Sequence, residues 1–194
     1  MIETILKNIA YTYYPKEIDA MTEKEDYVMT VEFNRLLDTI NDIQKNEGFQ
    51  KSYDSLIIGF NSHNSVKNIK DVSVLDWLDR CISFELDIVQ GNELIKICLN
   101  ISLIVPYYIV YLLKNDIEVN PYKWLTLPKR DRELEASEYG ELITQISSIV
   151  EKNTHYNKFP ESIGKIILPD ISFGEVVFGD FSLYNAFFLD ENKL

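Results

Sequence analysis

Two histidines are the side chains of this sequence best suited to general acid–base chemistry. His63 lies in the stretch GFNSHNS between Ser62 and Ser65, and His155 follows a predicted helix. A serine beside a histidine in sequence seldom has the geometry of a catalytic triad, and the Gly-x-Ser-x-Gly motif is missing. We interpret His63 as part of a polar loop, and His155 as a helix-terminal residue that would interact favourably with the helix dipole.

A pair of carboxylates is the second possible acid–base device. Glu85 and Asp87 are two residues apart in a predicted strand, so both side chains point to one side of it. Lys96 is expected opposite Asp87 on the neighbouring strand. This arrangement favours a solvated cross-strand ion pair, and we predict no catalytic residue here.

Motifs for metals, phosphates and nucleotides are absent. The sequence has no His-x-x-x-His, no Cys-x-x-Cys, no Asp-x-Asp-x-Asp-Gly and no glycine-rich phosphate loop. Cys81 and Cys98 are too few for a disulfide framework, and we expect reduced thiols packed in or near a sheet. The prediction is therefore no metal and no cofactor.

Composition and net charge indicate which kind of macromolecule this protein can bind. The chain has 194 residues, of which 46% are hydrophobic, enough for one compact domain with one core. The net charge is −12, with −5 in residues 1–65 and −7 in residues 131–194. An acidic surface repels a phosphate backbone and attracts a basic protein, so we expect no nucleic acid as a partner.

The longest apolar run, LIVPYYIVYLL at residues 103–113, is about half a membrane span and contains Pro106. It predicts buried strand structure. The first residues show neither a basic segment nor an apolar one of the secretory type. We expect no membrane association and a cytoplasmic location.

The elements that would position these side chains are predicted from periodicity. Residues 1–48 have helical spacing of apolar residues, in one helix up to Tyr13 and a second opened by a capping box at Thr22 and Glu25. We expect these two helices to cover a β-meander over residues 80–115. A further helix is predicted at 137–153, a short one from Pro160, and a C-terminal β-hairpin at 170–190.

The meander has a defined register. Gly91-Asn92 is a two-residue hairpin signal, and folding about it pairs Phe84 with Leu99 and Leu86 with Ile97. Residues 107–114 continue as a strand without alternation, which predicts cover on both faces or the wall of a cleft. The fold class that follows is α+β, an antiparallel meander packed against helices in a single domain spanning 1–194.

The stretch FGDFSLYNAFFLDEN, residues 178–192, contains five aromatic rings and three carboxylates. We expect its aromatic residues to form mainly strand and core. The carboxylates would lie along the exposed edge of the predicted C-terminal hairpin, where a basic partner can bind. The predicted partner-binding residues are Glu175, Asp180, Asp190, Glu191 and Tyr108.

The segments LIVPYYIVYL and FPESIGKIILPDISFGEVVFGDFSLYNAFF resemble bacterial immunity proteins of polymorphic-toxin systems, over roughly Leu103 to Phe188. The resemblance implies a non-enzymatic protein that binds a cognate toxin domain and neutralises it. It carries over no binding residues. The alternative hypothesis is an enzyme or small-molecule-binding protein with a cleft near Tyr107–Tyr111. Neither the toxin's activity nor the oligomeric state follows from the sequence.

Overall fold

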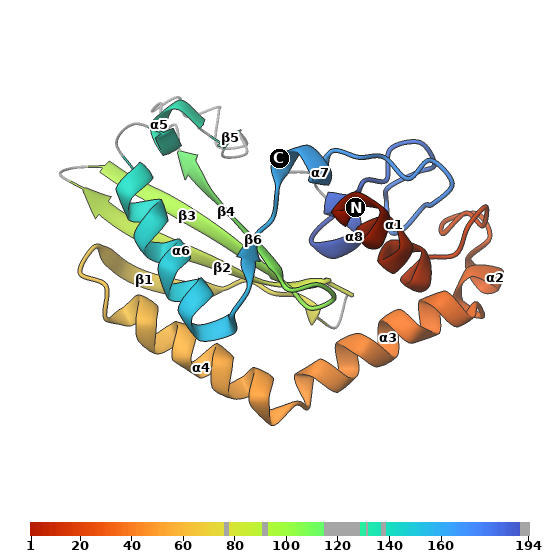
Figure 1. Cartoon of the computed structure of the whole chain (residues 1–194), viewed down its shortest axis with the longest axis horizontal. Helices are drawn as coiled ribbons and strands as arrows, with labels where there is room; N and C mark the ends of the chain where they lie inside the picture. The colour runs from red at the N-terminus through yellow and green to blue at the C-terminus, as the bar shows by residue number, and fades with distance from the viewer. Residues whose placement is uncertain (76–77, 91–92, 115–128, 131, 137–138, 191–194) are drawn as a thin grey trace, which may run out of the picture.

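The computed structural model describes residues 1–75, 78–90, 93–114, 129–130, 132–136 and 139–190 (Figure 1). These residues form a single α+β domain, so the predicted fold class is confirmed. Helices and strands follow in the order α1 (Ile2–Tyr13), α2 (Lys24–Val28), α3 (Val31–Gln44), α4 (Glu47–Asn61), β1 (Val66–Asp71), β2 (Cys81–Gln90), β3 (Glu93–Ser102), β4 (Tyr107–Lys114), β5 (Lys129–Arg130), α5 (Arg132–Ala136), α6 (Gly140–Thr154), β6 (Asn157–Lys158), α7 (Glu161–Gly164) and α8 (Leu183–Phe187).

The sheet has the order β1-β2-β3-β4-β5, with all of these neighbours antiparallel. The predicted register between β2 and β3 is confirmed, because Phe84 pairs with Leu99 and Leu86 with Ile97. The predicted turn at Gly91-Asn92 lies outside the described residues. Side chains alternate between faces, so this register places every second residue of both strands on one buried face. This isoleucine-rich face consists of Ile82, Phe84, Leu86, Ile88, Ile95, Ile97, Leu99 and Ile101.

Strand β4 is covered at its outer edge as well as on its faces. The short strand β6 pairs in parallel with its first residues, and β5 pairs with its last. Between them, Oε1 of Glu135 accepts a hydrogen bond from the backbone N–H of Leu112 at 2.8 Å. Residues 108–113 are buried, as expected for a strand without alternation.

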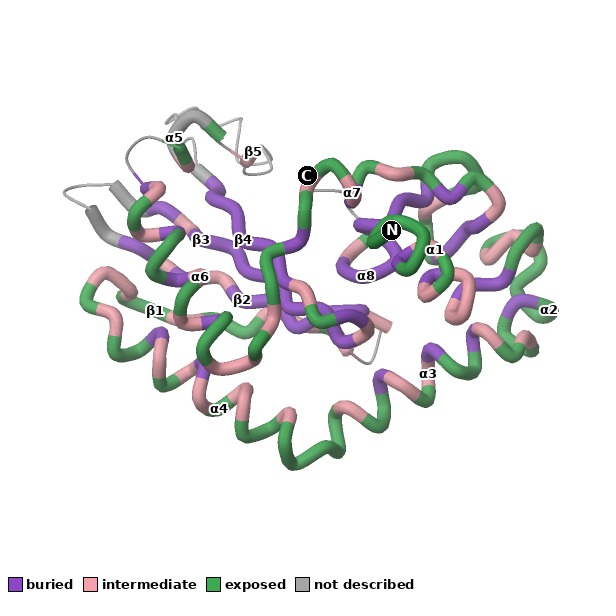
Figure 2. The backbone as a smooth tube through the Cα atoms, viewed as in Figure 1, coloured by how far each residue is buried: buried purple, intermediate pink, exposed green. Residues whose placement is uncertain are grey.

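Helices α4 and α6 cover the isoleucine-rich face of the sheet (Figure 1). The rings of Tyr53 and Phe60 on α4 pack against Phe84, with centroids 5.5 and 5.9 Å away. On α3 and α4, the residues that face outward are exposed, while those that face the rest of the protein are buried or half-buried (Figure 2). Neither α4 nor β1 was predicted from the sequence.

The predicted packing of the N-terminal helices on the meander is wrong. Helix α1 packs against α3 and α8, away from the strands (Figure 1). The predicted second helix is also divided, because Thr30 begins α3 by accepting a hydrogen bond from Phe33 N–H at 3.3 Å. A threonine side chain that caps a new helix competes with continuing the preceding one.

The predicted C-terminal hairpin over residues 170–190 is also wrong. This part of the chain forms loops with two isolated bridges, Ile167 with Ser182 and Phe173 with Val176, followed by α8. Ser182 and Asn185 form a capping box that starts the helix. Every residue of this short helix is buried, so its apolar residues do not follow the period of an amphipathic helix. For this reason the segment was predicted as a strand.

Candidate partner-binding site

The loop of residues 174–180, GEVVFGD, is the most exposed part of the C-terminal segment; we call it the acidic loop. Glu175 and Asp180 are exposed near its two ends. Between them, Val177 is 48% exposed and Phe178 is 38% exposed. The loop therefore presents an aromatic and an aliphatic side chain between two carboxylates, and within the described residues neither carboxylate forms an ion pair.

The backbone of the acidic loop is held in a compact conformation. Gly174 and Gly179 adopt positive φ angles of 56° and 86°, which side chains rarely tolerate. Phe173 and Val176 exchange two backbone hydrogen bonds of 3.0 and 2.9 Å. The N–H of Gly179 also donates to the carbonyl of Pro169 at 3.2 Å. Both ends of the loop are thus tied to neighbouring backbone.

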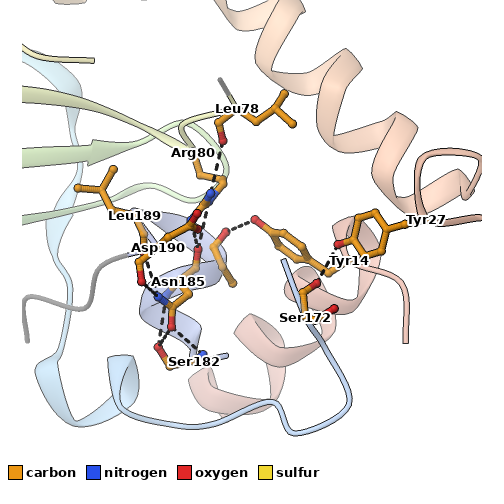
Figure 3. A network of polar contacts seen from close by, with 10 residues as sticks. Tyr14, Tyr27, Leu78, Arg80, Ser172, Ser182, Asn185, Leu189 and Asp190 are labelled. Carbon is orange, nitrogen blue, oxygen red and sulfur yellow. Dashed lines mark hydrogen bonds and ion pairs between the residues drawn. The ribbon is translucent and has the colours of Figure 1, made fainter. Parts of the chain in front are cut away.

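Below the loop, Arg80 forms a buried polar centre (Figure 3). Its guanidinium donates to the Asn185 carbonyl at 2.9 and 3.1 Å and forms an ion pair with Asp190 at 2.6 Å. The guanidinium also lies 4.7 Å from the ring centroid of Phe173, the residue that precedes the loop. Burial alone would lower the pKa of Arg80, but Tyr14 and Asp190 outweigh it and raise that pKa, so the charge is retained.

Asparagine 185 organises the same centre. Its Oδ1 accepts from the N–H and the hydroxyl of Ser182, while its Nδ2 donates to the carbonyls of Leu189 and Asp190 (Figure 3). The carboxylate of Asp190 rests against Gly174, where a Cβ atom would collide with it. Arg80, Asn185 and Asp190 therefore connect the start of β2 to the base of the acidic loop.

The N-terminal helices support the loop from the other side. Tyr14 is fully buried, and its hydroxyl donates to the Ala186 carbonyl at 2.7 Å. Tyr27 donates to the Ser172 carbonyl at 3.0 Å (Figure 3). These bonds join residues more than 140 positions apart in the chain, since their sequence separations are 172 and 145. They explain why α1 and α2 lie against the C-terminal segment.

The predicted partner-binding residues have different surroundings. Glu175 and Asp180 lie on the acidic loop. Asp190 is also exposed, and its side chain forms the ion pair with the buried Arg80. Glu191 is outside the described residues. Tyr108 is fully buried and donates its hydroxyl to Glu151 at 2.7 Å, so its ring does not line the surface.

The exposure of Phe178 differs from the sequence-based expectation that it belongs to the core. Phe181, Leu183, Phe187 and Phe188 are completely buried, but Phe178 is not. The signal available in the sequence was the pair of glycines, Gly174 and Gly179, that bracket the exposed residues.

The tyrosine-rich strand is packed without an open cleft at its described side chains. Tyr108 and Tyr111 are buried, and Tyr107 packs against Phe159 with centroids 5.3 Å apart. The two cavities beside α4 are lined by other residues. This packing gives no support to the alternative hypothesis of a cleft near Tyr107–Tyr111.

The remaining residues with possible chemistry make structural contacts. His63 shares a hydrogen bond of 2.7 Å with Gln145, and His155 ends α6 in a left-handed conformation. Lys96 pairs with Glu85 at 2.7 Å, while its directly opposite neighbour Asp87 accepts from Asn68. The predicted Asp87–Lys96 ion pair is therefore replaced by a diagonal one.

Cys81 and Cys98 are both buried and form no disulfide. Among the described residues, no cluster of three or more His, Cys, Asp and Glu side chains suits a metal ion. Over the same part of the chain, no helix combines the length and apolar character needed to cross a membrane. Comparisons with protein-family models, curated proteins and solved structures give no match.

Proposed function

We propose that this protein is a non-enzymatic bacterial inhibitor that binds and neutralises a basic toxin domain in the cytoplasm. The partner docks on the acidic loop. The observation that carries the proposal is the exposure of Phe178 and Val177 between two carboxylates, Glu175 and Asp180. The resemblance to immunity proteins and the net charge of −12 support the same function.

The loop has the features of a protein-binding hot spot. An aromatic side chain supplies a large apolar contact area, and surrounding carboxylates steer a basic partner during encounter. The backbone of the loop is already held by the Phe173–Val176 bridge and by the centre around Arg80. Less conformational entropy is lost on binding when the loop is ordered beforehand. Nucleic acid does not suit this surface, because its phosphates carry the same sign of charge.

The direct test uses the protein encoded by the neighbouring gene. The two proteins are co-expressed, and the mixture is separated by size-exclusion chromatography. We expect a stable complex, and we expect the inhibitor to restore growth to cells that make the neighbouring protein alone. Separate elution together with no effect on growth would contradict the proposed function for that pair.

The docking surface is tested by charge reversal. Replacing both Glu175 and Asp180 with Lys should slow association by about tenfold at low ionic strength, with a smaller effect at high salt. Stability should change by only about 1 kcal/mol or less, because both positions are exposed. Surface plasmon resonance at several salt concentrations measures the rates.

The matched control replaces Asp38 and Asp42, exposed on α3, with Lys. This variant has the same change in net charge on another surface, and its association rate should fall much less. Unchanged rates for the loop variant would place the docking surface elsewhere. A larger loss for the α3 variant would place it on the N-terminal helices.

The aromatic anchor is tested separately. Phe178→Ala should mainly accelerate dissociation, because it removes buried contact area without altering charge. Met29→Ala is the control, since Met29 is 80% exposed and lies on the α2–α3 connection. Equal dissociation rates for Phe178→Ala and the unmodified protein would exclude Phe178 as an anchor.

A further inference from the structure

A pocket of about 250 Å³ opens at the elbow between α3 and α4. It is bounded by the end of α3, the first turns of α4, the starting half of β2, the end of β3 and the end of α6. Its lining consists of Ile43, Gly48, Phe49, Ser52, Tyr53, Leu56, Ile82, Ile101, Leu103, Thr154 and Tyr156. The pocket therefore lies over the isoleucine-rich face of the sheet. Helices α3 and α4 diverge from the elbow between them (Figure 1).

The side chains that line the pocket are all uncharged. A charged ligand would lose its hydration there without gaining a counter-ion, which is unfavourable. The floor is formed by the buried side chains of Leu56, Ile82 and Ile101. An apolar molecule would gain dispersion contacts with this floor and remove it from water.

The four hydroxyl-bearing side chains differ in their hydrogen bonds. Tyr53 donates to Asp71 at 2.6 Å, and Thr154 donates to the Val150 carbonyl at 2.8 Å. The hydroxyls of Ser52 and Tyr156 have no hydrogen-bond partner among the described residues. Burial raises the pKa of Tyr156, so its phenol remains protonated and able to donate. Two polar groups are thus available to a ligand in an otherwise apolar site.

We propose that this pocket binds a small, uncharged, largely apolar molecule with one hydrogen-bonding group, which contacts Ser52 and Tyr156. A cavity of about 150 Å³ holds benzene, so this larger space suits roughly ten non-hydrogen atoms. Mostly apolar walls with a few polar groups are typical of small-molecule sites. The pocket shares no lining residue with the acidic loop, so this site is independent of the proposed protein partner.

The test uses β-naphthol, which has the required size, one hydroxyl and no charge at neutral pH. Binding is followed by amide chemical-shift changes in the purified full chain. We expect saturable shifts for the pocket residues in α4 and at the end of α6. The carboxylate analogue β-naphthoate should bind about tenfold more weakly or worse, because the site has no cation. No saturable shifts with β-naphthol, or equal binding of the two compounds, would overturn the proposal.

Two variants assign the contacts. Ser52→Leu fills the pocket and removes a hydroxyl, so β-naphthol affinity should fall by about tenfold or more. Ser148→Leu makes the same change on the exposed face of α6 and should leave affinity within about twofold. Unchanged affinity in a folded Ser52→Leu protein would contradict the site.

Tyr156→Phe keeps the ring and removes only its hydroxyl. Affinity for β-naphthol should fall by about threefold to tenfold, while affinity for naphthalene should not change. This comparison remains decisive if Ser52→Leu does not fold. An equal effect on both compounds would show that the tyrosine only shapes the pocket and makes no hydrogen bond.

Discussion

Gly174 and Gly179 have similar backbone angles but different surroundings. Both have positive φ, yet a Cβ added at Gly179 would meet no atom within 4 Å, whereas one at Gly174 would collide with the Asp190 carboxylate. Gly179→Ala should lower the free energy of unfolding by about 1 kcal/mol through backbone strain alone. Gly174→Ala should lower it by about 2–4 kcal/mol, because Asp190 is also displaced from the buried Arg80. Urea denaturation measures both values.

A third variant isolates the contribution of Asp190. In an Asp190→Ala background the carboxylate is gone, so Gly174→Ala should lower stability only as much as Gly179→Ala does. If Gly174→Ala remained more harmful in this background, its effect would come from backbone strain and not from the ion pair with Arg80.

At the level of elements, the short helix α8 depends on one buried asparagine. Asn185 makes four side-chain hydrogen bonds, whereas Asn46, which caps α4, makes a single one to Phe49 N–H at 3.0 Å. Asn46→Ala should lower the free energy of unfolding by about 1 kcal/mol, as for an exposed cap. Asn185→Ala should lower it by about 3 kcal/mol, because several buried polar groups lose their partners.

Partner binding by the acidic loop provides a second measurement that distinguishes Asn185→Ala from Asn46→Ala. Asn185 contacts the segment that carries Asp190, so Asn185→Ala should also loosen the loop and weaken partner binding. Asn46→Ala lies on another element and should not change binding. Equal losses of stability and equal binding for the two variants would show that α8 is not organised by Asn185.

For the whole molecule, tyrosines whose pKa is raised by folding predict loss of stability in alkali. Burial, followed by the hydrogen bond to Asp170, raises the pKa of Tyr11 from 10.0 to about 12. Burial is also the largest cause that raises the pKa of Tyr108 from 10.0 to about 12. The folded protein therefore holds these protons more tightly than the unfolded chain. Their stabilisation is complete below pH 10 and is lost as the pH rises toward about 12.

The measurement is the urea midpoint as a function of pH across this alkaline range. Tyr108→Phe removes one titrating group, so its midpoint should decline less steeply than that of the unmodified protein. At neutral pH the same variant should be less stable by about 1 kcal/mol, because the hydrogen bond to Glu151 is lost. Identical slopes for the two proteins would exclude Tyr108 from the alkaline transition.

The period-two pattern of residues 82–101 by itself determined the central hairpin. Alternate side chains of a strand face opposite sides, so a slip by one residue would move Phe84, Leu86, Ile97 and Leu99 to the other face. The two-residue hairpin signal Gly91-Asn92 then selects one register among those that remain. The unalternating residues 107–114 likewise predicted a strand, either covered on both faces or forming the wall of a cleft, and the structure shows the first. These features depend on neighbours in sequence or on one short turn, and they were predictable for that reason.

The acidic loop was only partly predictable. Its carboxylates, Glu175 and Asp180, were identified from charge, but the exposure of Phe178 was not. Seven of the eleven residues at 178–188 are apolar or aromatic, and a short run of this kind fits a buried strand as well as a buried helical turn. In the buried segment, the capping box of Ser182 and Asn185 stabilises the helix start and so favours the helix over the strand.

Only the tertiary structure decided what lies beneath the loop. Arg80 and Asp190 are 110 residues apart, and Tyr14 and Ala186 are 172 apart. No local period relates such residues, because their contact depends on how α1, the sheet and the C-terminal segment pack together. The sequence determined which segments must be buried and which side chains carry charge. The packing determined which of those charges pair with a buried group and which do not. Asp190 stays exposed but pairs with the buried Arg80, because a buried cation needs a counter-ion.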